Sequence, residues 1–320
     1  MAKEQKSPFR LVGDIGGTNA RFALLSQSFD LHHIKILPCK EYGDFSGAVK
    51  DYLSRVGEPD IDEAAFAIAN PITGDRVQMT NHRWNFSIEE TRRLLGLERL
   101  IFKNDYTTLA MSIPRLDDSD LWQLGGEAKR KKETYAVIGP GTGLGVSGMV
   151  YINDDWFAVE GEGGHVTLSP GSEREYAIMR LCQEWFGHVS AERLVSGPGL
   201  SNIYRAICML EKVPEAELSP SEISQKGVMN SDPYCAESIA IFCGLLGSVA
   251  GDLVLTLGAY GGLYLGGGIA PKIKTYLQSS TFRQRFESKG RMRMLLKDVP
   301  VYVITAPTPA LIGISQVFNH

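Results

Sequence analysis

The feature that most constrains this fold is a structural unit that occurs twice. In each copy a short apolar strand leads into a glycine- and threonine-containing turn, and a second apolar strand follows. The first turn spans residues 13–18 (GDIGGT), and the second spans residues 139–143 (GPGTG), beginning 126 positions later. Two unrelated glycine-rich hairpins are the alternative interpretation. Repetition of the whole strand–turn–strand unit instead favours two lobes of related topology.

Apolar runs of strand length alternate with amphipathic helical stretches around these turns. In the first half the pattern predicts helices at residues 45–55 and 87–95, the second opened by a capping box of Ser87 and Glu90. Expected strands cover residues 9–12, 20–25, 33–37, 64–69 and 100–102. Strands interleaved with helices predict an α/β fold whose sheets are buried on both sides.

The alternation weakens between residues 110 and 134, where we place the boundary between lobes. The expected division is a small N-terminal lobe at 1–115 and a large lobe at 116–305. In the large lobe, strands are predicted at 135–138 and 144–152, and a helix at 172–186 with a Ser172/Glu175 capping box. Thr308-Pro309 then opens a short C-terminal helix.

Composition excludes several classes of partner. The chain has 33 Lys plus Arg against 37 Asp plus Glu, so nucleic acid is not an expected partner, and the basic run at 129–132 is interpreted as a solvated loop. The N-terminal residues lack an apolar signal segment, and the uncharged stretch 253–271 holds six glycines, which suits a core. We therefore expect a cytoplasmic protein with no membrane partner.

Metal sites built from cysteine or histidine are also not expected. The five cysteines form no C-x-x-C pair and lie among apolar neighbours, where cysteine acts as a small hydrophobic residue. The histidines show neither H-x-x-x-H nor H-E-x-x-H spacing, so a zinc enzyme is disfavoured.

Both glycine turns are suited to binding phosphate groups. Glycine lets backbone N–H groups converge on an anion, and threonine adds a hydroxyl donor. The chain has no P-loop motif, and the spacing of Gly141, Gly143 and Gly145 does not fit a dinucleotide fingerprint. Asp14 within the first turn indicates Mg²⁺, because a carboxylate beside a polyphosphate is tolerated mainly where a cation offsets the repulsion.

Two polar clusters are candidates for the remaining chemistry. Asp105 follows an expected strand, so it could face a ligand crevice as a general base, or it could be the N-cap of the next helix. Glu160-Gly161-Glu162-Gly163-Gly164-His165 joins carboxylates and an imidazole on a glycine-rich backbone. Such a cluster suits hydrogen bonds to vicinal hydroxyls, but metal ligation or a simple polar turn remains open.

Taken together, these motifs resemble the bacterial ATP-dependent glucokinase family. The blocks that carry the resemblance are GDIGGTNAR at 13–21, NPITGD at 70–75, Asn104-Asp105, GTGLG at 141–145, GEGGHV at 161–166, SAER at 190–193 and GGGI at 266–269. They stand in the family's order and extend over nearly the whole chain. Each block is weak alone, and their combination is specific.

The resemblance implies the hexokinase–actin superfold, with two α/β lobes of ribonuclease H-like topology around a central cleft and the last helix, 306–320, returning to the first lobe. It implies Asp105 as the base that accepts the proton of the sugar's 6-hydroxyl. The implied sugar ligands are Asn104, Asp105, Glu162, His165 and Glu192. The implied nucleotide loops are Gly13, Asp14, Ile15, Gly16, Gly17 and Thr18, then Gly141, Thr142 and Gly143, and on the adenosine side Gly266, Gly267 and Gly268. Asp14 would lie near Mg²⁺, and glucose and ATP would be the substrates of an expected homodimer.

Two positions depart from the family pattern. Pro140 and Asn70 each replace a small residue, and Pro140 also lacks a backbone N–H, which puts one donor of the second loop in doubt. No C-x-C-G cluster follows His165, so the zinc-containing sugar kinases are not close matches.

Other functions are compatible with such a fold. A kinase for fructose or an N-acylhexosamine is the nearest alternative, and an actin-like or sugar-sensing protein is a more distant one. A DNA-binding repressor would need a helix pair before Gly13, where about a dozen mostly polar residues leave no room for one. A filament protein would not need the cluster from Glu160 to His165, so the site residues favour the enzyme.

Overall fold

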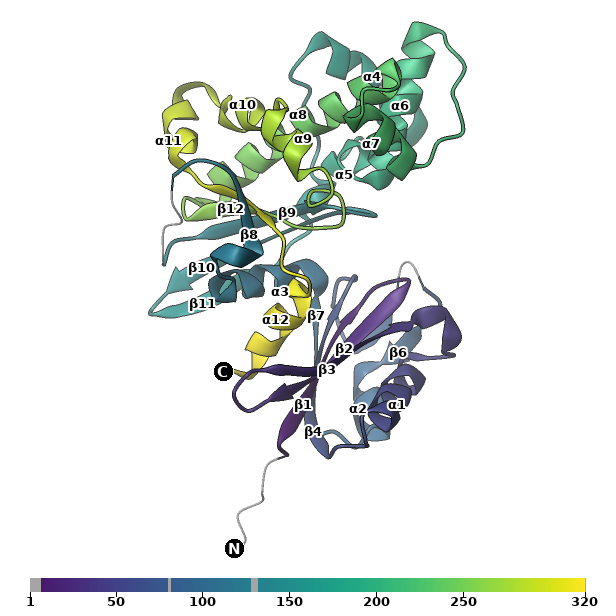
Figure 1. Ribbon diagram of the computed structural model, residues 1–320, viewed down its shortest axis with the longest axis vertical. Helices are drawn as coiled ribbons and strands as arrows, with labels where there is room; N and C mark the ends of the chain where they lie inside the picture. The colour runs from purple at the N-terminus through teal and green to yellow at the C-terminus, as the bar shows by residue number, and fades with distance from the viewer. Residues whose placement is uncertain (1–6, 80–81, 128–131, 320) are drawn as a thin grey trace, which may run out of the picture. The chain divides into compact units, whose positions relative to one another are not determined.

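The computed structural model describes residues 7–79, 82–127 and 132–319, and the chain forms two compact units. Unit 1 comprises Met1–Arg115 and Pro307–His320, and unit 2 comprises Leu116–Ala306. Each unit has its own sheet and its own helices (Figure 1). Most of the basic run at 129–132 lies outside the described residues, and only Lys132 is described.

Unit 1 is built on a five-stranded sheet in the order β3-β2-β1-β4-β7. Its strands are β1 (Phe9–Ile15), β2 (Asn19–Ser26), β3 (Leu31–Pro38), β4 (Ile61–Ile68) and β7 (Arg99–Asn104). β1, β2 and β3 form an antiparallel meander, whereas β4 and β7 run parallel to β1. A separate two-stranded ribbon joins β5 (Arg76–Gln78) to β6 (Asn85–Ser87).

Helices cover both faces of this sheet. On one face α1 (Phe45–Arg55) and α2 (Ile88–Leu94) enclose an aromatic core in which the rings of Phe45 and Phe66 lie 4.9 Å apart, edge to face. On the other face Val12 and Ala65 pack beneath α12 (Pro309–Ser315), which crosses α3 (Asp105–Ser112). The crossing is close because residue 313 is glycine, since a Cβ there would overlap the carbonyl oxygen of Thr108.

Unit 2 repeats this topology. Its sheet has the order β11-β10-β9-β12-β13-β8, in which β9, β10 and β11 form the antiparallel meander and β12 and β13 run parallel to β9. The strands are β8 (Leu121–Gly125), β9 (Tyr135–Pro140), β10 (Leu144–Ile152), β11 (Asp155–Val159), β12 (Gly262–Leu265) and β13 (Val301–Ile304). The glycine turns join corresponding strands, β1 to β2 and β9 to β10, so the predicted repeat is confirmed.

Helices of unit 2 pack around the long helix α8. Those in contact with α8 (Pro233–Leu257) are α5 (Ala191–Leu194), α6 (Gly197–Glu211), α7 (Pro220–Val228) and α10 (Phe282–Glu287). The unit also contains α4 (Glu173–Phe186), α9 (Lys274–Ser279) and α11 (Arg293–Asp298). Its short 3₁₀ turns, among the described residues, are η3 (Asp118–Asp120), η4 (Gly163–His165) and η5 (Gly290–Met292), whereas η1 (Cys39–Glu41), η2 (Ile113–Arg115) and η6 (Gln316–Phe318) belong to unit 1. α8 contacts α6, α7 and α10 and forms the centre of the unit's core.

Among the described helices, α8 is long and apolar enough to cross a bilayer, but 56% of its most apolar window is buried inside the unit. Gly247 and Gly251 bring α10 close, since a Cβ at either position would press on the α10 backbone. Close packing of this kind is the behaviour of a core helix.

Two local expectations need correction. Residues 121–125 form the edge strand β8 in a stretch where no strand was predicted. At α4, Ser172 accepts the expected hydrogen bond from the Glu175 N–H, but the Glu175 carboxylate binds Arg285 and the N–H of Gly171 instead of closing the capping box. The Arg285 guanidinium offers a buried carboxylate a stronger partner than a backbone amide.

Candidate functional site

One group of candidate residues lies at the carboxyl edge of the parallel strands of unit 1. Ile15 at the end of β1 is in register with Ile68 at the end of β4, and Ile68 with Asn104 at the end of β7. Neighbouring strands are about 4.8 Å apart, so the turn after β1, the Asn70 loop and Asp105 emerge side by side. Open α/β sheets hold their ligands at this edge.

The first glycine turn is held by backbone hydrogen bonds. The N–H of Gly16 donates to the Asn19 oxygen at 3.0 Å, and the N–H of Cys39 donates to the Thr18 oxygen at 2.9 Å. Thr18 is exposed and Gly17 half-buried. Residues 16–18 therefore form the accessible tip of this turn, and Asp14 before them is also half-buried.

Two of the expected loop residues are strand residues with structural roles. Gly13 pairs with Phe22, and a Cβ at Gly13 would come within 2.6 Å of Cδ1 of Phe66. The side chain of Ile15 is fully buried in the core. Packing in the core therefore explains why residue 13 is glycine and residue 15 is isoleucine. Only the backbone of these two residues could contact a nucleotide.

Asp14 is a carboxylate held in an ion pair. Its Oδ2 lies 2.9 Å from Nη1 of Arg21, on the neighbouring strand. Burial raises the pKa of Asp14, while the Arg21 guanidinium opposes that shift. In the described part of the chain no group of three or more His, Cys, Asp or Glu residues could hold a metal ion. A lone carboxylate fits Mg²⁺ that is bound mainly by substrate phosphates, which is the usual arrangement for that ion.

Asn104, not Asp105, is the N-cap of α3. Its Oδ1 accepts the N–H groups of Tyr106 and Thr107 at 2.9 and 3.2 Å. α3 therefore begins at Asp105, one residue earlier than an Asp105 cap would place its start. Asp105 Oδ1 also accepts the Tyr106 N–H at 3.0 Å. A carboxylate in this first turn interacts favourably with the helix dipole.

Another group of candidate residues lies in unit 2, where two glycine loops meet. β12 is paired with β9, Leu265 opposite Ile138, and the N–H of Gly266 donates to the Ile138 oxygen at 2.9 Å. A Cβ at Gly141 would lie 4.0 Å from the backbone nitrogen of Gly268. The two expected nucleotide loops of this unit are therefore adjacent.

Local geometry explains two special residues of these loops. Gly267 has φ +76°, a conformation that glycine adopts without strain. Pro140 contributes its carbonyl, which accepts the N–H of Ile269 at 3.3 Å. Its missing N–H therefore does not prevent it from linking the two loops.

The amino end of α6 also contacts the second loop, a feature that sequence reasoning missed. The N–H of Gly197 donates to the Gly141 oxygen at 2.8 Å. Ser196 caps this helix by accepting the N–H of Gly199 at 3.0 Å. The run Ser196-Gly197-Pro198-Gly199 is a typical helix start and could have been found in the sequence, although its contact with the loop could not.

The predicted sugar cluster forms a compact turn, η4, on the surface of unit 2. The N–H of His165 donates to the Glu162 oxygen at 3.0 Å, and both side chains are exposed. Gly163 and Gly164 pack on β10, where a Cβ at Gly164 would overlap the carbonyl oxygen of Leu144. The backbone of the turn is therefore fixed while its polar side chains face solvent.

Glu192, the third predicted sugar ligand of unit 2, joins this turn to the glycine loop. It is half-buried, and its Oε2 accepts the Leu144 N–H at 2.8 Å. The N–H of the preceding residue, Ala191, donates to the Val166 oxygen just after η4 at 2.9 Å. Unit 2 thus brings together Glu162, His165 and Glu192 near the loop at 141–143.

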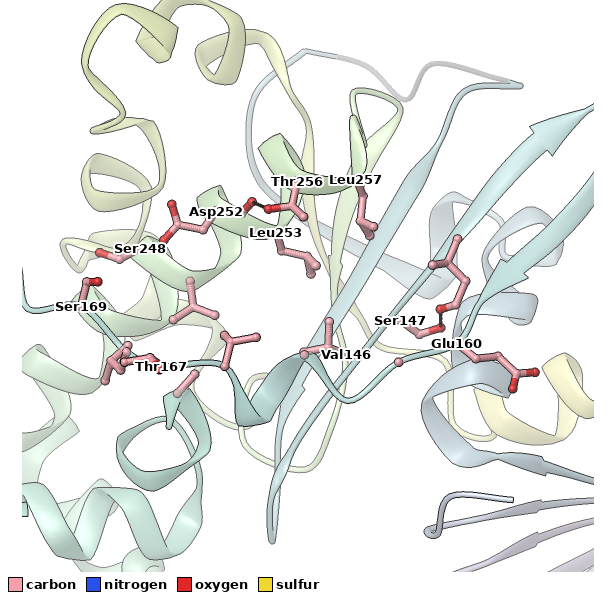
Figure 2. A pocket seen from close by; sticks show the side chains of 17 residues that line it. Val146, Ser147, Glu160, Thr167, Ser169, Ser248, Asp252, Leu253, Thr256 and Leu257 are labelled. Carbon is pink, nitrogen blue, oxygen red and sulfur yellow. Dashed lines mark hydrogen bonds between the residues drawn. The ribbon is translucent and has the colours of Figure 1, made fainter. Parts of the chain in front are cut away.

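A cavity of about 280 Å³ adjoins the backbone of η4, and Figure 2 shows the side chains that line it. Gly161 and Gly163 line it, whereas the side chains of Glu162 and His165 do not. Figure 2 shows an apolar middle containing Leu253, with polar side chains toward both ends. None of the predicted ligands of sugar or nucleotide lines it, so it is distinct from the predicted contacts.

Comparison with known proteins is consistent with this geometry. The glucokinase family profile matches residues 11–320. A curated glucokinase of Chromobacterium violaceum is 51% identical over 306 residues, covering 96% of this chain and 88% of that protein. This chain belongs to the glucokinase family. It is an ATP-dependent hexose kinase, so the predicted family and enzyme class are confirmed.

Two further relatives support the same assignment. The glucokinase of Neisseria meningitidis serogroup C, serotype 2a, is 48% identical, covering 97% of this chain and 95% of its own. The crystal structure of a glucokinase from an Antarctic psychrotroph is 32% identical with a TM-score of 0.88, covering 98% of this chain and 99% of that one. The predicted two-lobed α/β fold of the glucokinase family is therefore confirmed.

Proposed function

We propose that this glucokinase-family enzyme transfers the γ-phosphoryl group of ATP to the 6-hydroxyl of glucose, with Asp105 as the general base. The observation that carries the proposal is the strand register of unit 1, which places Asp105 and the first glycine turn at one sheet edge. A base and a phosphate-binding turn on the same edge are the two elements that phosphoryl transfer requires.

In the proposed reaction the 6-oxygen of glucose attacks the γ-phosphorus as its proton passes to the Asp105 carboxylate. The bond from the γ-phosphorus to the bridging oxygen breaks, and ADP leaves with that oxygen. Asn104 supports this role by capping α3, which fixes the direction of the first turn. Positioning of reactants supplies much of the rate enhancement in such transfers.

Sugar hydroxyls are proposed to bind Asn104, Asp105, Glu162, His165 and Glu192. Ionised carboxylates accept charge-assisted hydrogen bonds from hydroxyl groups, and an imidazole can donate or accept. The exposed position of Glu162 and His165 on a fixed turn supports this role. Equatorial hydroxyls of a hexose provide neighbouring donors and acceptors with which such a cluster can form hydrogen bonds.

The nucleotide is proposed to bind the glycine turns at 13–18 and 141–143, and the loop at 266–268. Thr18 and Thr142 are both exposed, so their hydroxyls are available to phosphate oxygens. Mg²⁺, when bound with ATP, offsets phosphate charge, and Asp14 is the residue that would lie near it. Arg21 holds that carboxylate in place.

Cytoplasmic location and a homodimer are proposed on the resemblance to bacterial glucokinases. Light scattering coupled to gel filtration checks the dimer, for which a mass near twice that of the chain is expected. A monomer at working concentration would contradict it.

Substrate choice is tested by measuring kcat/KM for glucose, fructose, mannose and N-acetylglucosamine with ATP and Mg²⁺. The highest value is expected for glucose. A higher value for an N-acylhexosamine would reassign the substrate while leaving the enzyme class unchanged. No transfer to any hexose would contradict the proposed function.

A further inference from the structure

The second glycine loop is held at both ends by one short segment of chain, the junction between α5 and α6. At one end Glu192 Oε2 accepts the Leu144 N–H at 2.8 Å. At the other end the Gly197 N–H donates to the Gly141 oxygen at 2.8 Å. Ser196 braces the junction, because its hydroxyl donates to the Glu192 backbone oxygen at 2.8 Å.

The Glu192 carboxylate occupies the space into which a side chain at position 143 would project. A Cβ at Gly143 would overlap Oε2 of Glu192 and lie 3.2 Å from its Cδ. By contrast, a Cβ at Gly141 would meet nothing nearer than the Gly268 nitrogen at 4.0 Å. The backbone conformation at Gly143 therefore depends on the position of the Glu192 carboxylate. The position of that carboxylate in turn depends on the loop backbone.

The sugar turn meets the loop at the same residue. Leu144 donates its N–H to Glu192, and its carbonyl oxygen packs against Gly164 of η4. The Ala191 N–H bonds to Val166 at 2.9 Å and joins η4 to the helix that carries Glu192. The three predicted sugar ligands of unit 2 and the phosphate loop thus form one packed assembly inside that unit.

We infer that Glu192 is a positioning residue for the phosphate loop as well as a sugar ligand, so that glucose and nucleotide affinities are coupled within unit 2. The inference rests on the proposed function, since it assumes that a sugar hydroxyl binds this carboxylate. A hydroxyl on the carboxylate restricts its position, which in turn restricts the Leu144 N–H and the loop at 141–143. Coupling between two binding equilibria is reciprocal, so nucleotide bound to the loop favours the sugar-binding position of Glu192.

The first test compares Gly143→Ala with Gly141→Ala. Glucose is titrated calorimetrically into each variant without nucleotide, after circular dichroism confirms the fold. Gly143→Ala should weaken glucose binding about 10-fold, the loss expected for one charge-assisted hydrogen bond, because its methyl group displaces Glu192. Gly141→Ala should bind glucose within about 2-fold of the wild type, since its methyl group has room.

The second test compares Glu192→Ala with Glu162→Ala. Both remove a proposed sugar ligand, but only Glu192 contacts the loop. A non-hydrolysable ATP analogue is titrated in the absence of sugar. Glu192→Ala should weaken analogue binding about 10-fold, because the Leu144 N–H loses its acceptor, whereas Glu162→Ala should leave it unchanged. A role for Glu192 in sugar binding alone would not produce this difference.

If Gly143→Ala does not fold, amide hydrogen exchange in the wild-type protein measures the same coupling without a substitution. Saturating glucose without nucleotide should slow exchange of the Leu144 amide. The coupling would be overturned if Gly143→Ala and Gly141→Ala had equal glucose affinity and Glu192→Ala and Glu162→Ala had equal affinity for the ATP analogue. An unchanged exchange rate of the Leu144 amide would also overturn it. Absence of glucose binding to the wild-type protein would instead overturn the proposed function.

Discussion

At the residue scale, Asn104 caps α3, and this leaves the adjacent Asp105 carboxylate available as the proposed base. An Asp that caps a helix has its oxygens committed to backbone amides, and here Asn104 supplies the oxygen that accepts both the Tyr106 and Thr107 N–H groups. Asp105 lies in the first turn and accepts the Tyr106 N–H through Oδ1. The two adjacent residues are therefore expected to respond differently to substitution.

Asp105→Asn should lower kcat by about 10²- to 10⁴-fold, because an amide cannot take the proton of the 6-hydroxyl. Glucose should still bind, since the amide can hydrogen-bond to that hydroxyl. Steady-state kinetics and glucose titration measure the two effects separately. Near-normal turnover of the folded variant would show that another group accepts the proton.

Asn104→Asp should separate capping from sugar binding. Asp and Asn cap helices about equally well, so the thermal midpoint should stay near that of the wild type. The change removes the amide donor, so the KM for glucose should rise about 10-fold, with little change in the KM for ATP. An unchanged KM for glucose would limit Asn104 to its structural role.

At the element scale, the sugar turn η4 depends on glycines that let it lie on β10. A Cβ at Gly164 would overlap the Leu144 carbonyl oxygen, and one at Gly163 would come within 2.8 Å of Cγ1 of Val146. Nothing lies within 4 Å of a Cβ at Gly161. Alanine at Gly164 would therefore clash with β10, whereas alanine at nearby Gly161 would not.

Gly164→Ala should destabilise the protein by about 1 to 3 kcal/mol through overpacking against backbone, and should weaken glucose binding as η4 shifts. Urea unfolding and glucose titration provide the measurements. Gly161→Ala is the control and should alter stability far less. If both variants lose equal stability, the packing of η4 on β10 is not what fixes the turn.

Unit 2 also contains an ion pair that links α4 to α10, between a buried carboxylate and a half-buried guanidinium. Oε1 and Oε2 of Glu175 lie 2.7 and 3.1 Å from the Arg285 guanidinium, and Glu175 is only 4% exposed. Glu175→Gln leaves the Arg285 charge without its partner, so the free energy of unfolding should fall by about 3 to 5 kcal/mol. Urea titration measures this fall, with Glu89→Gln at an exposed ion pair as the control. A loss no larger than that of the control would contradict the assignment.

Sequence patterns predicted the elements that local signals define. The helix at 45–55 was located correctly, because apolar periodicity begins just after Asp44, which caps it by accepting the Gly47 N–H. β8 was missed, because only one of its five residues is buried. The contact of Glu192 with Leu144 joins residues 48 positions apart, so no local pattern could indicate it. The family resemblance supplied Glu192 as a candidate, but not its contact with the loop.

At the scale of the whole molecule, the proposed sugar ligands are divided between the two units, with Asn104 and Asp105 in unit 1 and the other three in unit 2. A sugar that binds residues of both units is expected to restrict their relative motion. Because this restriction comes only with the sugar, ATP is not held for attack by water before the correct acceptor is bound.

Glucose should therefore lower the radius of gyration in solution and raise the rate of ATP consumption from a low basal value. Small-angle scattering with and without glucose measures the first effect, after any change in oligomeric state is excluded. An ATPase assay without sugar measures the second. An unchanged radius together with rapid sugar-free hydrolysis would favour a preformed site.

The central claim is the transfer of a phosphoryl group from ATP to one hydroxyl of glucose. Phosphorus NMR of the reaction of wild-type protein with ATP, Mg²⁺ and glucose identifies the product directly. Glucose 6-phosphate and ADP are expected in equal amounts. Phosphate on another hydroxyl, or ADP with inorganic phosphate and no sugar phosphate, would contradict it.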